Sequence, residues 1–269
     1  MSESYPSRIA VIGAGIMGEA LLSALITSGI SRRAITVSEK REQRAIELNV
    51  KYGVNIAGIK ENVEKSDAIL LVVKPQDMSG LLMEMKPYLS PGTLLISIAA
   101  GKKIEFVLDH VGDLFPVIRV MPNTPALVGE GMAAMSIGSH VTDSQKDFVK
   151  SFLQATGRVV EIDESLQDAV TAVSGSGPAY FFAFVEAMVA SGAKLGLPVD
   201  VATELTVQTI VGAAKLLSFS GKSAKELREN VTSPNGTTAA ALASFEQSGL
   251  SEIVAKAMTA ARDRSQELA

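Results

Sequence analysis

The sequence predicts an α/β fold, in which a doubly wound domain with a parallel sheet is followed by an all-helical domain. Two observations predict it. Short β-branched runs alternate with helical patterns in the first half, and strand signals stop after about residue 160. The length of 269 residues also exceeds one average domain, for which the prior is roughly 150 residues. We therefore predict one domain over residues 1–163 and a second over residues 164–269.

The strand-like runs of the first half are short and apolar throughout, which is typical of strands covered on both faces. They are residues 8–13, 34–38, 68–73, 93–98 and 116–121. Helical patterns lie between them, such as residues 17–29 and 41–53. Each of these two ends on a glycine, Gly29 or Gly53, at a C-cap position. The alternation predicts a parallel sheet between two layers of helices.

The second half has helical periodicity to its end. Its helices carry Ala, Gly and Val on faces where a solvated helix carries Lys and Glu, so they need more cover than one small domain provides. We therefore expect a homodimer or a larger assembly through this half. The uncharged run 169–185 contains Gly175, Gly177 and Pro178, and we interpret it as a buried helix with a Gly-rich entry rather than a membrane span.

Composition and charge exclude several classes of function. A formal net charge of −4 argues against a nucleic-acid partner. The sequence has no cysteine and only two histidines, His110 and His140, so disulfides and thiol nucleophiles are excluded and a metal site is not expected. No basic stretch followed by an apolar one opens the chain, and we predict a cytoplasmic protein with a small-molecule partner and no membrane association.

The motif GAGIMG directly follows the first strand and opens a helix. Gly13 permits the tight turn, Gly15 lets a pyrophosphate approach the backbone, and Gly18 lets helix and strand pack closely. The helix start at Ile16 and Met17 supplies free N–H groups to phosphates. This context predicts a Rossmann-type dinucleotide site. The alternative is a Gly-rich turn without a ligand.

The end of the second strand, VSEKREQR, bears on which dinucleotide binds. An acid there binds the ribose 2′-hydroxyl of NAD, whereas basic residues hold the 2′-phosphate of NADP. Glu39 is the candidate acid, and Ser38, Lys40, Arg41 and Arg44 are the candidate phosphate ligands. The basic residues also suit the solvated first turn of the next helix, so these residues leave the choice open.

Residues 230–245 carry no formal charge and contain the sequence VTSPNGTTAAAL. Hydroxyls and free N–H groups at a helix N-terminus hold an anion without Lys or Arg, helped by a dipole effect of roughly 0.3–1 kcal/mol. Ser233, Gly236, Thr237 and Thr238 supply such groups. We interpret the segment as an uncharged cradle for a carboxylate. The alternative is an ordinary Thr N-cap after a Pro-Asn-Gly turn.

Other candidates follow strands or open a helix. Lys74 and Asn123 with Thr124 lie at the carboxyl edge of the predicted sheet, where ligands bind in such folds. A solvated Lys cap and a rigid two-proline loop are the alternatives at these places. The motif SGSGPAY, which begins at Ser174, predicts either a wall of the substrate pocket or a close helix crossing.

The motifs VVKPQD, RVMPNTPALVGEG, AVSGSGPAYFF and VTSPNGTTAAAL resemble those of pyrroline-5-carboxylate reductases, in their order and spacing over essentially the whole chain. The resemblance implies reduction of the imine of 1-pyrroline-5-carboxylate to L-proline by hydride from NAD(P)H, the last step of proline biosynthesis. It implies a Rossmann domain, a helical domain with an interwoven dimer that often assembles into decamers, and a substrate site between one nucleotide domain and the helical dimer.

The resemblance also implies roles for residues of the cradle. Ser233, Gly236, Thr237 and Thr238 would contact the substrate carboxylate or ring nitrogen. Thr238 is the catalytic candidate, as the partner of the nitrogen, and whether it donates a proton or only orients the substrate stays open. The family commonly has two adjacent glycines in this motif, and Asn235 replaces the first. Asn tolerates a left-handed backbone, so we expect the turn to survive.

For the cofactor, the resemblance places the pair Lys74 and Pro75 beside the dinucleotide and implies NADPH. Two positions that hold the 2′-phosphate in some relatives match Glu39 and Ile59 here, and neither side chain can do so. Because Lys40 and its neighbour Arg41 could restore a phosphate site, NADPH remains the prediction and NADH the alternative.

Two other functions fit parts of this sequence less well. A β-hydroxyacid dehydrogenase also joins a Rossmann domain to helices, but Lys194 and Lys215 lack the GxxxNxxK context of its catalytic lysine. A dinucleotide-dependent regulator without catalysis has no reason to keep the cradle free of charge.

Overall fold

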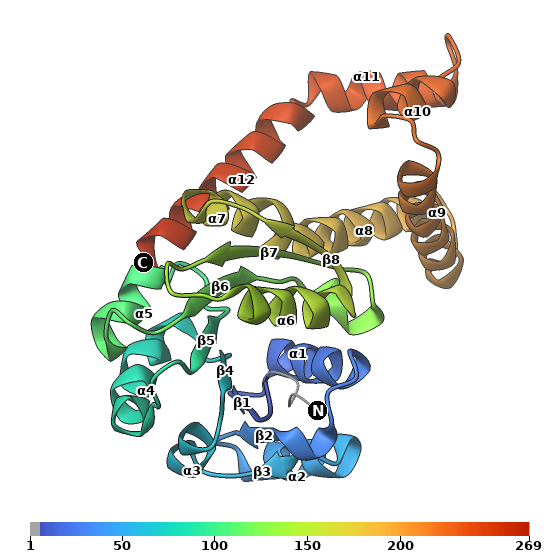
Figure 1. The fold of residues 1–269 in the computed structure, drawn as a ribbon. Helices are drawn as coiled ribbons and strands as arrows, with labels where there is room; N and C mark the ends of the chain where they lie inside the picture. Colours follow the sequence, from blue (N-terminus) through green and yellow to red (C-terminus); the bar gives the residue numbers. More distant parts are fainter. Residues whose placement is uncertain (1–5, 269) are drawn as a thin grey trace. The chain divides into compact units, whose positions relative to one another are not determined.

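The computed structural model describes residues 6–268 and divides the chain into two compact units. The first unit runs to Pro178 and takes in the chain again from Ala260, and the second unit is Ala179–Thr259. The doubly wound α/β fold followed by helices is confirmed (Figure 1). The boundary predicted between residues 163 and 164 stays a prediction.

The first unit contains one eight-stranded sheet in the order β3-β2-β1-β4-β5-β6-β7-β8. Neighbouring strands are parallel except for β6 and β7. The strands are β1 (Ile9–Ile12), β2 (Ile35–Ser38), β3 (Asn55–Ile56), β4 (Ala68–Leu71), β5 (Leu94–Ser97), β6 (Val117–Met121), β7 (Gly131–Ile137) and β8 (Gly157–Glu161).

The predicted strands are therefore all present, but the prediction was incomplete at both edges of the sheet. It missed β3, β7 and β8, and it did not foresee that β7 runs antiparallel to β6. The physical reason differs between the strands. The residues of β3 are exposed, β7 is built largely from Gly, Ala and Met, and only β8 carries a β-branched pair. None of them is an apolar β-branched run of the kind that predicts a buried strand.

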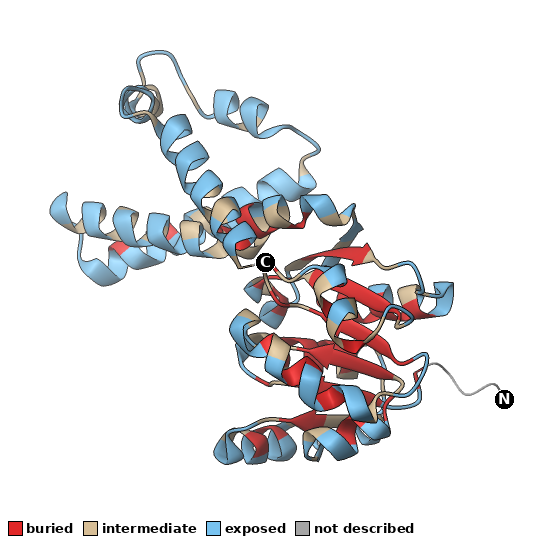
Figure 2. Cartoon of the chain, turned by 90° about the vertical axis from the view of Figure 1, so that its left-hand side faces the viewer, coloured by how far each residue is buried: buried red, intermediate tan, exposed pale blue. Residues whose placement is uncertain are grey.

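Helices cover both faces of the sheet, as Figure 1 shows. In β1, Ile9 and Val11 belong to one apolar cluster while Ala10 and Ile12 belong to the other, because side chains alternate across a strand. The first cluster is closed by α1 (Ile16–Thr27), α2 (Glu42–Tyr52) and α6 (Asp143–Gln154), and the second by α3 (Ile59–Glu64), α4 (Met78–Met85) and α5 (Ile104–Val111). Figure 2 shows buried residues concentrated on these layers.

The predicted helix ends agree with the structure to within two residues. Gly53 is the C-cap of α2 with φ 68°, a left-handed conformation that suits glycine. The first helix ends at Thr27, and Gly29 follows with φ 97°.

The first unit continues beyond the sheet through α7 (Gln167–Val170) and a π-helical turn, Thr171–Gly175. The remaining helices are α8 (Gly177–Lys194), α9 (Val199–Phe219), α10 (Ala224–Asn230), α11 (Thr237–Gln247) and α12 (Leu250–Glu267). The last of these begins in the second unit and ends in the first.

Helices of the second unit expose many large apolar side chains. Phe181 and Phe182 in α8 are 64% and 63% exposed, and Phe219 at the end of α9 is 84% exposed. The buried helix expected over residues 169–185 is therefore wrong for the single chain beyond its Gly-rich entry, because one copy of the chain offers no cover for this face. Within residues 6–268, no helix is both long and apolar enough to cross a membrane.

Candidate functional site

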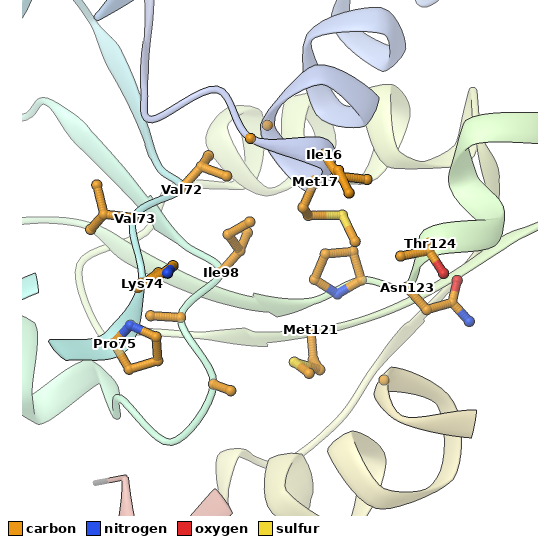
Figure 3. A pocket seen from close by; sticks show the side chains of 16 residues that line it. Ile16, Met17, Val72, Val73, Lys74, Pro75, Ile98, Met121, Asn123 and Thr124 are labelled. Carbon is orange, nitrogen blue, oxygen red and sulfur yellow. The ribbon is translucent and has the colours of Figure 1, made fainter. Parts of the chain in front are cut away.

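A cavity of about 350 Å³ lies at the carboxyl ends of the central strands of the first unit. Loops that follow β1, β4, β5 and β6 form it, and Gly175 of the π-helical turn completes the lining (Figure 3). Lys74 and Pro75 lie on one side of the view in Figure 3, and Asn123 and Thr124 lie on the opposite side. The cavity is thus at the place where an open α/β sheet binds its ligand, beside the point where the strand order reverses between β1 and β4.

The Gly-rich loop forms one wall of this cavity. A Cβ added to Gly13, whose φ is 87°, would lie 2.7 Å from the carbonyl oxygen of Val72, and one added to Gly18 would lie 2.5 Å from the carbonyl oxygen of Gly13. These contacts confirm the tight turn and the close packing expected of the two glycines. A Cβ on Gly15 would meet no protein atom within 4 Å. The space beside Gly15 is open to a ligand.

The first turn of α1 faces the same cavity. Gly15 is the N-cap and has no side chain to cap the helix, and the first intrahelical bond runs from the N–H of Glu19 to the oxygen of Gly15 at 2.9 Å. The N–H groups of Ile16, Met17 and Gly18 precede that bond and have no partner within the helix. Together with the open space beside Gly15, they fit the pyrophosphate of a dinucleotide.

Glu39 closes the loop from the side of β2. Its Oε2 accepts the N–H of Ala14 at 3.0 Å, and its Oε1 accepts the backbone N–H and the Nε–H of Arg41 at 3.1 and 2.9 Å. Burial raises the pKa of the Glu39 carboxyl, but the hydrogen bonds from Arg41 and Ala14 outweigh burial and hold this pKa below its ordinary value. The carboxylate therefore stands charged at the end of β2, where a dinucleotide's adenosine ribose binds.

The other candidate phosphate ligands differ in their availability. The hydroxyl of Ser38 is buried, donates to the oxygen of Ala57 at 2.9 Å and accepts from Asn62 at 3.0 Å. Arg44 donates to the oxygen of Ala14 at 3.2 Å and pairs with Glu19. Lys40 is exposed to solvent, and Arg41 is engaged by Glu39. The arrangement thus leaves two exposed cations in this group, Lys40 and its neighbour Arg41, of which Arg41 is paired with Glu39.

A charged cluster behind the Gly-rich loop holds α1 to α2. Glu19 accepts hydrogen bonds from Lys51 at 2.7 Å and from Tyr52 at 2.8 Å, and it pairs with Arg44. The hydrogen bond from Lys51, with those from Arg44 and Tyr52, outweighs burial and lowers the pKa of Glu19 to about 2. Because Arg44 also binds the oxygen of Ala14, this cluster supports the loop from outside the cavity.

Asn123 ties together two walls of the cavity. Its Oδ1 accepts the N–H of Met132 at 2.8 Å, and its Nδ2 donates to the oxygen of Ser174 at 3.2 Å. The Ser174 hydroxyl donates back to Val170 within its own turn, and its neighbour Gly175 is the residue of this motif that lines the cavity. Asn123 therefore both faces the cavity and braces it.

Sequence reasoning missed several lining residues. Met121 and Ile98 belong to this group, as do the small residues after β5, Ala99 and Ala100. They are apolar or small and carry no chemical signal. Their position at or directly after the end of a strand, at the same edge of the sheet as Lys74, is the feature that could have identified them.

The predicted cradle lies in the second unit. Ser233 accepts the N–H of Gly236 at 3.0 Å across a turn whose third residue, Asn235, has φ 59°. Pro followed by a residue with positive φ is typical of a type II turn, so the left-handed Asn235 is confirmed. Gly236 is the N-cap of α11 with no side-chain cap, and Thr237 is its first residue. The alternative of a Thr N-cap is therefore wrong.

The hydroxyls of the cradle are not equivalent. Thr232 donates to the oxygen of Arg228 at 2.6 Å, so its hydroxyl is used within the preceding turn. Ser233 and Thr237 are exposed and Thr238 is half-buried. The free N–H groups of Thr237 and Thr238 in the first turn of α11 stand beside these hydroxyls. An anion at this place would find donors and no opposing carboxylate within the segment.

Comparisons with known proteins agree with this geometry. A family model described as pyrroline-5-carboxylate reductase dimerisation matches residues 164–268, and a model described as NADP oxidoreductase, coenzyme F420-dependent, matches residues 8–101. The pyrroline-5-carboxylate reductase of Corynebacterium melassecola is 41% identical over 97% of this chain and 98% of its own length. That of Pseudomonas aeruginosa is 40% identical over 97% of both chains.

A solved structure is also similar over the whole chain. The pyrroline carboxylate reductase of Plasmodium falciparum with NADP bound has a TM-score of 0.90 and 31% identity, and the match covers 99% of both chains.

Proposed function

Because the chain belongs to the pyrroline-5-carboxylate reductase family, we propose which of its residues carry out the reduction of 1-pyrroline-5-carboxylate to L-proline. The protein is an NADP-dependent oxidoreductase of proline biosynthesis, and its helical half is a dimerisation region. The observation that carries the assignment of residues is the open space beside Gly15, at the N-terminus of α1 and the switch point of the sheet.

The dinucleotide is held by the backbone more than by side chains. Gly15, Ile16, Met17 and Gly18 bind the pyrophosphate, which places the adenosine ribose at the end of β2. The nicotinamide then lies toward the ends of β4, β5 and β6, where Lys74, Pro75 and Asn123 belong to the lining. When bound, NADPH supplies the hydride that reduces the imine carbon.

The carboxylate of the substrate binds at the N-terminus of α11. Ser233, Thr237 and Thr238 offer hydroxyls there, and Thr237 and Thr238 add free N–H groups, which replace the water that the anion loses. Gly236 lies between them as the N-cap, and its own N–H already donates to Ser233. Thr238 holds the ring nitrogen by a hydrogen bond. A hydroxyl is a poor acid, so the role of Thr238 is to orient the protonated imine rather than to protonate it. Ser174 takes part through its backbone, which bonds Asn123 beneath the cavity.

At the ribose, Glu39 and Arg41 set the cofactor preference. NADPH is the cofactor, and its 2′-phosphate takes Lys40 and Arg41 as partners. NADH is the second cofactor, because the Glu39 carboxylate suits a 2′-hydroxyl. The ratio of the two kcat/KM values tests this assignment.

The dimer associates further into a larger assembly, for which a decamer is the proposed state, and a cytoplasmic location stays a prediction. The apolar exposure of α8 and α9 supports burial of these helices against further copies of the chain. The mass in solution, measured by light scattering, distinguishes a dimer from a decamer.

The decisive experiment follows the absorbance of NADPH with and without racemic 1-pyrroline-5-carboxylate. Substrate-dependent oxidation and formation of proline are expected. If the folded, oligomeric protein oxidises neither NADPH nor NADH with this substrate, the reductase activity is refuted and a dinucleotide-dependent regulator is favoured.

A further inference from the structure

A buried arginine lies just before the cavity on β6. Arg119 is 4% exposed, and its guanidinium is 3.3 Å from Glu164 and 3.6 Å from Asp168. Glu164 also accepts the N–H of Ile104 at 2.7 Å. A buried charge persists only when it is paired, so this cluster holds β6, the start of α5 and the segment leading into α7 in one arrangement.

The end of the chain joins the same cluster. Ser265 near the end of α12 is 2% exposed, and its hydroxyl donates to Asp168 at 2.7 Å. A Cβ on Gly101, which has φ 77°, would lie 2.6 Å from the oxygen of Ser265. The last turns of α12 therefore pack directly on the loop after β5. All of these residues belong to the first unit.

Three segments that meet at this cluster lead into the lining of the cavity. Ala100 precedes Gly101, and Met121 lies two residues after Arg119 on the same strand. Asp168 lies in α7, which leads into the π-helical turn that carries Gly175. A Cβ on Gly175 would lie 2.5 Å from the methyl carbon of Met121, so these two residues are in direct contact across the wall. π-Helical turns often occur at functional sites.

We propose that Ser265 and Arg119 are positioning residues, which act through Asp168 to fix the cavity wall formed by Met121, Asn123 and Gly175. This wall lies at the ends of the strands that take the nicotinamide, as the proposed function requires. The end of the C-terminal helix thereby sets where the ring stands for hydride transfer. The effect on hydride transfer rests on the proposed function. The fixing of the cavity wall rests only on contacts within this chain.

The position of the wall leads to a specific kinetic signature. The groups proposed to bind the pyrophosphate and the adenosine ribose follow β1 and β2, and β4 and β5 lie between these strands and β6, which carries Arg119. Displacing the wall should therefore lower kcat while the KM for NADPH stays unchanged. A small misplacement of reacting groups costs up to about a hundredfold in rate, and we expect about fivefold to twentyfold for the loss of one hydroxyl.

The test uses Ser265→Ala in the full-length protein, with Ser66→Ala as the matched control. Ser66 is also buried and donates a hydrogen bond of 2.7 Å, to the backbone oxygen of Asn62. It lies just before β4, at the amino end of that strand, whereas the cavity lies at the carboxyl ends of the strands. Asp168→Asn is the second variant, because it keeps an oxygen for Ser265 and removes the charge that faces Arg119. Hydrogen exchange of the cofactor-free protein, the fluorescence of bound NADPH, and kcat with KM are measured for each.

We expect Ser265→Ala and Asp168→Asn to speed exchange in segments 119–132 and 171–178, to change the nicotinamide emission, and to lower kcat at constant KM for NADPH. Ser66→Ala should leave these two segments and kcat unchanged. Unchanged exchange at the wall, or faster exchange without a fall in kcat, would overturn the proposal. A wild-type protein without reductase activity would refute the proposed function instead, and the exchange data would still show whether Ser265 holds the wall.

Discussion

The two units of the chain differ in how far their large apolar side chains are exposed to solvent. In the first unit, Ile9 and Phe152 are at most 1% exposed because the sheet and its two layers of helices cover each other. In the second unit, Phe182 and Phe219 are 63% and 84% exposed in the single chain. Burying one such side chain stabilises by roughly 1.5–3 kcal/mol, so association of these helices with another copy of the chain is favourable. One half of this sequence encodes a core and the other encodes an interface.

The two units also differ in the kind of binding site that each one carries. In the first unit, the backbone of a Gly-rich loop provides a cavity within one chain. In the second unit, the cradle at the start of α11 is largely exposed in one chain. Substitutions should therefore separate cofactor binding, assembly and substrate binding from one another.

The largest effect is expected from Gly15→Ala, which fills the open space of the cavity without touching protein. The Kd for NADPH should rise about a hundredfold, which corresponds to roughly 2.8 kcal/mol, while Tm falls by only a few degrees because Ala is a poorer N-cap than Gly. Gly80→Ala is the matched control, since a Cβ there also meets no atom within 4 Å. Fluorescence titration and thermal unfolding check both variants. Equal NADPH affinity in the two variants would contradict the pyrophosphate site.

The second test addresses the interface. Phe182→Ser should weaken the assembly by roughly 2 kcal/mol or more and lower its mass at micromolar concentration, because an apolar anchor is lost from the dimerisation region. Leu114→Ser removes a side chain that is 78% exposed in the first unit, and it should leave the mass unchanged. Sedimentation or light scattering over a dilution series measures both. Equal masses of the two variants would show that Phe182 of α8 does not contribute to the interface.

Third, Thr238→Val should lower kcat/KM for 1-pyrroline-5-carboxylate about tenfold to a hundredfold, since a hydrogen bond to a charged group is worth about 1.5–3 kcal/mol. Binding of NADPH should not change. Thr232→Val is the control, because that hydroxyl already donates to Arg228 and should have no part in the reaction. Steady-state kinetics of both variants measure this effect. An unchanged kcat/KM in Thr238→Val would refute the proposed role of this hydroxyl in holding the substrate.

A smaller effect is expected at the adenosine ribose. Glu39→Gln removes a negative charge near the proposed 2′-phosphate, so the ratio of kcat/KM for NADPH over NADH should rise about tenfold. Arg41→Ala should lower the same ratio. Glu47→Gln, which removes an exposed partner of Arg44, serves as control. A ratio that does not respond to Glu39 or Arg41 would assign the preference to other residues.

The smallest effect concerns pH. The pKa of Glu19 falls from 4.5 to about 2 in the folded chain, so its ion pairs stabilise the fold above pH 4.5 and lose this contribution as pH falls toward 2. With solvent screening, the loss should be about 1–2 kcal/mol of unfolding free energy. Urea unfolding of the wild type and Glu19→Gln at pH 7 and pH 3 measures it. A difference between the two proteins that is the same at both pH values would contradict this account.

Much of the first unit follows from its sequence because the responsible signals are local. Apolar β-branched runs predicted the central strands, and glycine at Gly13 and Gly53 predicted backbone that few other residues adopt. The left-handed Asn235 in the cradle was predicted for the same reason. In each case, neighbours in the chain decide the conformation.

Contacts between distant segments depended on the tertiary structure. Ser38 stays a predicted ligand of the 2′-phosphate, and only the structure shows that its hydroxyl already bonds Ala57 and Asn62. Ser265 reaches Asp168 across 97 positions of sequence. Periodicity does not encode such pairs, because which side chains meet is set by packing of whole elements. The sequence by itself thus determined the fold, the family and the glycine loop, whereas packing decided which polar groups remain available to a ligand.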